Sequence, residues 1–185
     1  ESLKPNPVVW DSQFVPMYLA LDGWKLEFKN GTTALADIVI GADGANSKIR
    51  PFITPIKSFY SGVTALEGNV YDAEITTPKI NELLKGGKIF AFGGSKDIIV
   101  SSKGDGSLAF YTSCKMEENW VSNSGIDFTN KQQVFDWFKK EFADWGEVWY
   151  ELFDNDKVYF VPRPINCMPL NQTWNALPNL TMLGD

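Results

Sequence analysis

The stretch ADIVIGADGANSKIR, residues 36–50, combines residue types that could approach a phosphate group. An apolar strand ends at Asp43-Gly44, small residues follow, and a short helix is predicted from Ser47. Small residues let the main chain come close to a phosphate at a helix start, but an ordinary Asp-Gly turn has the same composition. The spacing does not match Gly-x-Gly-x-x-Gly, and the lysine and hydroxyl pair of a P-loop is missing. From these residues alone, both a phosphate loop and a structural turn remain open.

The side chains that the chain contains limit its chemistry. It has no histidine and only two cysteines, Cys114 and Cys167. Histidine triads and histidine metal sites are therefore excluded, and two distant cysteines make no disulfide framework. We expect a cofactor or a carboxylate to carry any chemistry, and both cysteines to be buried free thiols of a cytoplasmic protein.

The overall composition narrows the class of protein. The net charge is −6 and no Lys/Arg cluster occurs, so nucleic acid is not an expected partner. The apolar runs are shorter than the roughly 20 residues that span a bilayer, so no membrane segment is expected. The 44% of hydrophobic and 14% of aromatic residues favour a thick core or an aromatic-lined cavity. The chain begins without methionine and ends in LTMLGD, so we expect a piece of a longer protein.

The predicted elements give an α+β fold: an antiparallel or mixed sheet with flanking helices, plus a partial α/β nucleotide-binding portion contributed by the chain ends. The predicted strands are 8–10, 14–21, 24–28, 38–40, 59–71, 89–92, 98–102, 108–113, 158–161 and 180–183. The predicted helices are 47–52, 78–84, one that follows Asn130, and 148–153. This order predicts a nucleotide-binding region at 1–57, a substrate-type domain at 58–177, and a strand at 178–185 that returns to the first region.

Three local patterns refine these elements. The continuous β-branched run at 38–40 is typical of a strand buried on both faces. Asn30-Gly31 predicts a two-residue hairpin turn. The Pro-Arg-Pro run at 162–164 is expected to end the strand before it.

Two segments together resemble a known family. Residues 37–50 read as polar, three apolar, two small, Asp-Gly, then Ser and Arg, which resembles the DG motif; residues 180–185 resemble the first half of the GD motif. The class A flavin-dependent aromatic hydroxylases carry both motifs in this order, with a substrate domain between them. Within that family, residues 140–153 and 168–185 look most similar to the Tet(X)-like tetracycline-inactivating monooxygenases.

The resemblance implies cofactors and a reaction. The parent protein would bind FAD, take hydride from NADPH or NADH, and transfer one oxygen atom to an aromatic or polyketide-like small molecule. The cofactor-binding residues that the resemblance implies are Asp43, Gly44, Arg50, Gly184 and Asp185. Arg50 could instead pair with a surface carboxylate, and the two aspartates could be ordinary turn residues.

The resemblance also places the substrate cavity on the middle sheet. Its candidate wall residues are Glu67, Phe90, Phe92, Phe110 and Tyr111. Aromatic residues on alternating strand positions belong more often to a core than to a pocket. Glu67 stands in an otherwise apolar strand, so its carboxylate needs a partner or a proton. The tetracycline branch has an amide at the position of Glu67 and a polar ring at that of Ala109, which puts tetracycline itself in question as the substrate.

Two other functions remain open beside the monooxygenase. One is a stand-alone module that binds a small apolar ligand, and the other is a flavin-dependent reductase or halogenase of the same superfamily. The resemblance also implies that a glycine-rich fingerprint and a helix after Asp185 are missing. We therefore expect the isolated chain to be inactive, to purify without FAD, and to self-associate through an exposed apolar face.

Overall fold

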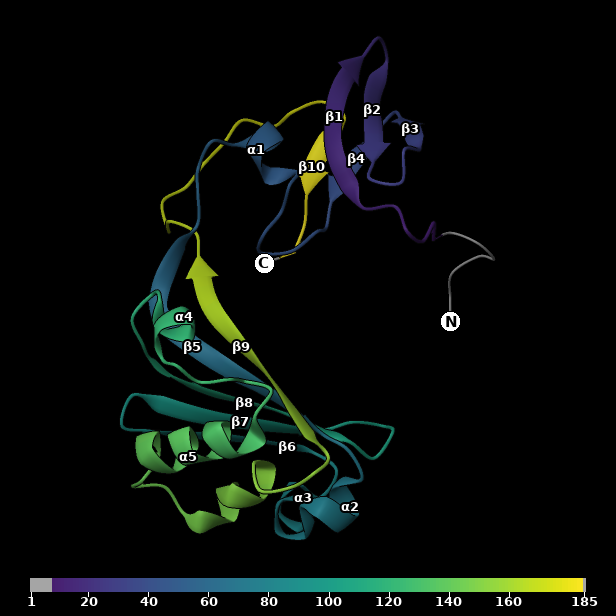
Figure 1. Cartoon of the computed structure of the whole chain (residues 1–185). Coiled ribbons are helices and arrows are strands. Elements are labelled where there is room, and N and C mark those ends of the chain that lie inside the picture. Colours follow the sequence, from purple (N-terminus) through teal and green to yellow (C-terminus); the bar gives the residue numbers. More distant parts are fainter. Residues whose placement is uncertain (1–7, 185) are drawn as a thin grey trace. The chain divides into compact units, whose positions relative to one another are not determined.

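The computed structural model describes residues 8–184, which form two compact units (Figure 1). Residues up to Ser58 and from Met168 onward make the first, here called the terminal unit, and Phe59–Cys167 make the second, here called the sheet unit. The fold class is α+β, as the sequence predicts. The second boundary lies at 167/168 and not at the predicted 177/178, because the chain from Met168 onward packs within the terminal unit.

The terminal unit contains two small sheets and one helical turn. Strands β1, β2 and β3 form an antiparallel sheet in that order, and β4 pairs in parallel with β10. The elements are β1 Phe14–Ala20, β2 Gly23–Phe28, β3 Thr33–Ala36, β4 Val39–Gly41, α1 Arg50–Ile53 and β10 Leu180–Met182. The chain end therefore returns to the strand that precedes the Asp43-Gly44 turn.

The core of the terminal unit is small and lies on one side of β4. The buried residues of this cluster are Met17, Val39, Ile49 and Leu180. Ile38 and Ile40 point the other way and are 64% and 55% exposed. The prediction of a strand buried on both faces is therefore wrong for the described chain, since β4 has an apolar layer against only one of its faces.

The sheet unit is built on five antiparallel strands in the order β6-β7-β8-β5-β9. The strands are β5 Phe59–Val70, β6 Lys88–Gly93, β7 Lys96–Ser102, β8 Leu108–Lys115 and β9 Val158–Cys167. The helical elements are α2 Ala73–Thr76, α3 Pro78–Leu84, α4 Trp120–Asn123, α5 Lys131–Glu141 and the 3₁₀ helix η1 Glu147–Leu152. No helix among the described residues is long and apolar enough to cross a membrane.

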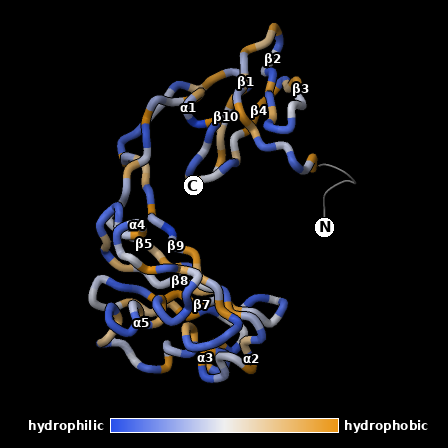
Figure 2. The backbone as a smooth tube through the Cα atoms, in the orientation of Figure 1, coloured by the Kyte–Doolittle hydropathy of each residue, from blue (hydrophilic) through white to orange (hydrophobic). Residues whose placement is uncertain are grey.

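One face of this sheet is covered by α3, α5 and η1, which share its core. Hydrophobic colour runs along the strands in Figure 2, and the buried cluster joins strand residues to helix residues such as Ile80 and Phe138. Phe110 lies at its centre, with its ring centroid 5.2 Å from that of Phe153. A Cβ at Gly68 would come within 2.1 Å of the Phe110 ring, so only glycine fits opposite that ring.

Several elements differ from those predicted from the sequence. Strand β9 continues to Cys167 and does not end at Pro162, because β9 is an edge strand and one of its two rows of main-chain groups has no partner strand. Residues 8–10 form no strand, and β3, α2 and α4 were not predicted. In the β2–β3 loop only Gly31 of the Asn-Gly pair has positive φ, at 82°, and β3 begins at Thr33, so the loop is longer than the predicted two residues.

The two cysteines are free, and they differ in burial. Cys114 is buried in the sheet unit, as expected, whereas Cys167 is half-buried at the end of β9. Burial, aided by the charge of Glu141, raises the pKa of the Cys114 thiol to about 12. The Cys114 thiol therefore stays protonated at neutral pH.

Candidate functional site

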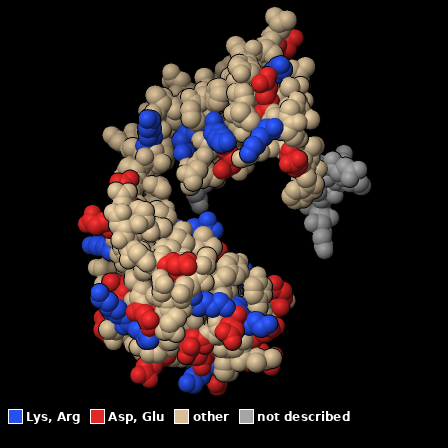
Figure 3. Space-filling view, viewed as in Figure 1, with Lys and Arg blue, Asp and Glu red and all other residues tan. Residues whose placement is uncertain are grey.

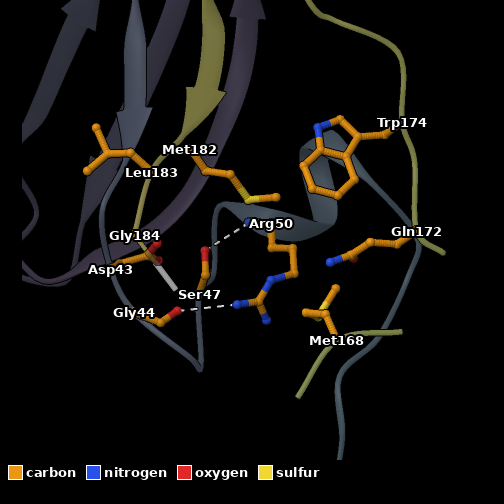
Figure 4. Close-up of a pocket in the computed structure, with 11 residues that line it drawn as sticks. Asp43, Gly44, Ser47, Arg50, Met168, Gln172, Trp174, Met182, Leu183 and Gly184 are labelled. Carbon is orange, nitrogen blue, oxygen red and sulfur yellow. Dashed lines mark hydrogen bonds between the residues drawn. The ribbon is translucent and has the colours of Figure 1, made fainter. Parts of the chain in front are cut away.

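The predicted cofactor residues meet at one cavity of the terminal unit. Leu180, Thr181 and Met182 lie opposite Val39, Ile40 and Gly41 in a parallel pair, so both strands end at the same edge. The turn after β4 and the chain after β10 then line a cavity of about 170 Å³ (Figure 4). Its lining residues are Gly41, Asp43, Gly44, Ser47, Arg50, Met168, Gln172, Trp174, Met182, Leu183 and Gly184. The structure therefore brings together four of the five predicted cofactor residues; Asp185 lies outside the described residues.

Asp43 and Ser47 hold the loop between β4 and α1 in shape. The Oδ2 atom of Asp43 accepts the main-chain N–H groups of Lys48 at 2.7 Å and Ile49 at 3.4 Å. Ser47 Oγ accepts those of Ile49 and Arg50 at 3.2 and 3.0 Å. These side chains satisfy the main-chain donors of the two residues before α1 and of its first residue, which otherwise have no acceptor. Burial tends to raise the pKa of Asp43, but hydrogen bonds from Ser47 and from the two amides outweigh it and hold the pKa below its usual value.

Arg50, the first residue of α1, also stabilises the loop between β4 and α1. Its Nη1 donates to the carbonyl of Ala45 at 2.9 Å and its Nη2 to the carbonyl of Gly44 at 3.4 Å. Among the described residues it forms no ion pair with a carboxylate, contrary to the alternative that the sequence left open. Because a guanidinium has five donors, N–H groups remain for a ligand in the cavity.

Glycines shape both edges of the cavity. Gly44 has a φ of 78° and Gly184 a φ of 100°, backbone conformations that side chains other than glycine rarely adopt. At Gly41 a Cβ would come within 2.9 Å of Ile49 Cγ2, so the turn packs closely on the strand end. The loop is thus a compact unit whose backbone conformation is fixed by its own residues.

The third wall of the cavity was not predicted. Met168, Gln172 and Trp174 come from the irregular chain between β9 and β10, which the sequence analysis placed in the substrate domain. Figure 4 shows the Trp174 ring and the Gln172 side chain on the side of Arg50 away from Gly44. Gln172 Oε1 is buried and has no hydrogen-bond partner among the described residues. The only sequence signal was an aromatic residue and an amide shortly before the return strand.

The donors around the cavity fit part of an FAD molecule. The main-chain N–H groups of Gly44, Ala45 and Asn46 have no acceptor among residues 8–184; Gly44 lines the cavity, and the guanidinium of Arg50 donates to the carbonyls of Gly44 and Ala45. Amide and guanidinium donors suit the oxygens of a diphosphate. Gln172 Oε1 could accept a ligand N–H or O–H. A cavity of about 170 Å³ has room for only a portion of FAD.

The predicted substrate residues divide between the two faces of the sheet unit. Phe110 is fully buried on the helix-covered face, so its assignment to a cavity wall is wrong. The reason is the two-residue period of a strand, which points Phe110 and Tyr111 in opposite directions. Glu67, Phe90, Phe92 and Tyr111 lie on the other face, here called the open face.

The strand register orders the residues of the open face. Phe90, Ile99, Tyr111, Glu67 and Val161 form one row across the five strands. Tyr111 is next to Glu67, whereas Phe90 is three strand spacings away, about 14 Å. Phe92 stacks on Phe90 with 6.5 Å between ring centroids and lies in the next row. The four residues therefore do not meet at one point.

Glu67 has the partner that its burial required. Arg163 Nε lies 2.9 Å from Glu67 Oε2, with Arg163 on the neighbouring strand β9. Asn69 is 3% exposed and accepts a 2.7 Å hydrogen bond from Lys103 Nζ at its Oδ1. Figure 3 shows acidic and basic side chains interspersed on the visible side of the sheet unit, with no basic stripe.

Comparison with known proteins identifies the fold. No family model matches the sequence. Among solved structures, HpxO of Klebsiella pneumoniae in complex with FAD and uric acid has a TM-score of 0.66 and 18% identity, covering 94% of this chain and 42% of that one. The 2,6-dihydroxypyridine-3-hydroxylase of Arthrobacter nicotinovorans has a TM-score of 0.69 and 17% identity over 94% and 48% of the two chains.

A third structure comes from the branch that the sequence suggested. The tetracycline destructase Tet(51) has a TM-score of 0.54 and 19% identity, covering 94% of this chain and 45% of that one. The chain has the fold of part of a flavin-dependent monooxygenase. The predicted resemblance to the FAD-dependent hydroxylases is confirmed at the level of the fold, and the chain spans less than half of each of these three proteins.

Proposed function

We propose that this chain is part of an FAD-dependent monooxygenase that acts on a small aromatic molecule. The parallel pairing of β4 with β10 carries this proposal, because it joins the Asp43-Gly44 loop, Arg50 and Gly184 at one cavity. The chain would hold one side of the FAD, and the rest of the cofactor would need residues beyond those described.

The residues of the cavity have separate roles in this proposal. Asp43 and Ser47 hold the loop through hydrogen bonds to its main chain, so the unpaired amides of residues 44–46 would need little further ordering to bind a ligand. Those amides and Arg50 would bind the diphosphate, and Gln172 would accept a hydrogen bond from another part of the cofactor. FAD, when bound and reduced, supplies the oxygen-activating chemistry for which this chain has no side chain of its own.

The finer assignments extend this proposal. We infer that NADPH or NADH reduces the flavin, and that the protein is cytoplasmic. HpxO was solved with uric acid, and another relative in fold is named for dihydroxypyridine, which supports an aromatic substrate. Glu67 and Tyr111 would contact this substrate from the open face. Glu67 in place of an amide makes tetracycline the less favoured choice.

Flavin uptake tests the proposed function. The chain of residues 1–185 should purify without stoichiometric flavin, whereas the longest reading frame that contains these residues should purify yellow and oxidise NADPH or NADH. In that longer protein, Arg50→Met should weaken FAD binding by at least about tenfold, the loss of charged hydrogen bonds to a phosphate. Lys25→Met on β2 is the matched control and should bind FAD normally. A longer protein that takes up no FAD at saturating concentrations would overturn the proposal.

The exposed apolar side of β4 is a candidate surface for self-association. Ile38, Ile40 and Leu183 are exposed, and we infer that copies of the isolated chain associate through them. Ile38→Lys with Ile40→Lys should then shift sedimentation toward a monomer. A wild-type chain that stays monomeric at high concentration would contradict this inference.

A further inference from the structure

Glu67 and Arg163 leave hydrogen-bonding capacity unused on the open face. Arg163 donates to Glu67 through Nε alone, at 2.9 Å, and its Nη1 and Nη2 have no acceptor among the described residues. Glu67 Oε1 receives only a long hydrogen bond, 3.4 Å, from Asn69 Nδ2. The exposed fractions of the two side chains are 19% for Glu67 and 54% for Arg163. A carboxylate acceptor and several guanidinium donors are therefore side by side and accessible to a ligand.

The neighbours of this pair favour a flat ligand. Tyr111 lies beside Glu67 in the strand register and is 38% exposed, and Val161 lies on the other side. An aromatic ring can stack on the tyrosine while its edge meets the ion pair. Lys103 donates a hydrogen bond to the buried Asn69, which lies two residues from Glu67 on the same face of β5. The site thus has a planar contact and two opposite hydrogen-bonding functions at one edge.

We propose that Glu67 and Arg163 select substrates whose aromatic ring carries an acceptor and a donor on the same edge. An aromatic lactam, or a ring hydroxyl beside a carbonyl, has this arrangement. Its oxygen accepts from Arg163, and its N–H or O–H donates to Glu67. A carboxylate would meet Arg163 but would be repelled by Glu67, so the pair also excludes such anions. This inference rests on the proposed function and specifies its substrate.

Three small probes separate this arrangement from its alternatives. The chain of residues 1–185 is titrated with three ligands: 2-pyridone, which has an acceptor and a donor on one edge, benzoate, which has acceptors only, and phenol. Binding is followed by two-dimensional NMR. We expect 2-pyridone to bind at least about tenfold more tightly than the others, because each of the others leaves one group of the pair without a hydrogen-bond partner. The chemical-shift changes that 2-pyridone causes should be largest at Glu67 and Tyr111. Benzoate binding more tightly than 2-pyridone would overturn the proposal.

Two substitutions test the pair itself. Glu67→Gln should weaken 2-pyridone by about tenfold or more and strengthen benzoate, because the repelling charge is gone. Arg163→Met should weaken both and leave phenol unchanged. Asp136→Asn breaks an ion pair of similar length, 2.8 Å to Lys139 on α5, and should leave the order of the three probes intact. Equal effects of Glu67→Gln on all three probes would overturn the proposal.

The outcome is separable from that of the flavin experiment, because the probes need no cofactor. Absence of the 2-pyridone preference, with FAD uptake intact in the longer protein, would overturn the substrate inference alone. A clear preference in a protein that takes up no FAD would overturn the proposed function and leave a lactam-binding site.

Discussion

The terminal unit and the sheet unit differ in how much core each closes by itself. The buried apolar cluster of the sheet unit has 18 residues, and that of the terminal unit has four among the described residues. One of those four, Leu180, comes from the far end of the chain. A unit with a thin core depends on each of its segments, whereas a thick core tolerates the loss of peripheral ones. The candidate cofactor cavity therefore lies in the less self-sufficient part of the molecule.

Removal of the segment after Cys167 should produce the largest difference in stability between the two units. A chain that ends at Cys167 lacks β10, so β4 loses its partner strand and the terminal unit loses Leu180. We expect β1, β2 and β4 to unfold while the sheet unit keeps its structure. Hydrogen exchange should show fast exchange at 14–41 and continued protection at 63–115.

A segment of residues 59–167 is the complementary control. It should unfold cooperatively in denaturant, because its cluster contains no residue from the terminal unit. Protection of β1 and β2 that is unchanged in the truncated chain would refute the difference between the units.

Substitution of one glycine in each core compares how tightly the two units are packed. Gly68→Ala drives a methyl group into the Phe110 ring, at 2.1 Å in the unchanged backbone, in the rigid aromatic core. We expect the sheet unit to lose about 3 kcal/mol or more of unfolding free energy. Gly41→Ala meets Ile49 Cγ2 at 2.9 Å in the thinner core, where the side chain can shift, and should cost the terminal unit about 1–2 kcal/mol.

Urea denaturation, followed separately in the two units, measures both costs. Gly104→Ala is the control, because a Cβ there has no atom within 4 Å and its φ is not positive. A Gly68→Ala protein as stable as this control would show that the core of the sheet unit is less tightly packed than the structure indicates.

The meeting of the two chain segments at the candidate cofactor cavity was largely predictable from the sequence. Two motifs in the expected order implied that their strands lie side by side, and β4 and β10 do pair in parallel. The glycines and Asp43 were informative because their roles depend on neighbours a few residues away. Gln172 and Trp174 were not predictable, since they lie on irregular chain without any periodicity.

The open face was predicted less well, for two different reasons. The two-residue period of a strand already separates Phe110 from Tyr111, so that error was avoidable from the sequence. The pairing of Glu67 with Arg163 spans 96 residues and depends on β9 continuing past Pro162 beside β5. Such a register is set by packing across the whole sheet, and local patterns do not contain it.

The smallest expected effect concerns Asp43 and its dependence on pH. Asp43→Ala removes the acceptor of two main-chain donors and should lower the stability of the terminal unit by about 1 kcal/mol, as the loss of a helix cap does. Asp43→Asn keeps an acceptor oxygen and should cost less. Neither should alter the sheet unit, which makes its unfolding the internal control.

The direction of the pH effect follows from the lowered pKa of Asp43. In the unfolded chain the carboxyl has its ordinary pKa of 3.8, and in the folded protein the pKa is lower. The stabilisation is therefore complete above the unfolded value and is lost as the pH falls from there through the folded value. The stability difference between wild type and Asp43→Asn should be constant near neutral pH and shrink in acid. A difference that grows as the pH falls below 3.8 would mean that Asp43 is protonated more readily in the folded protein, and that the hydrogen bonds from Ser47, Lys48 and Ile49 do not fix the loop.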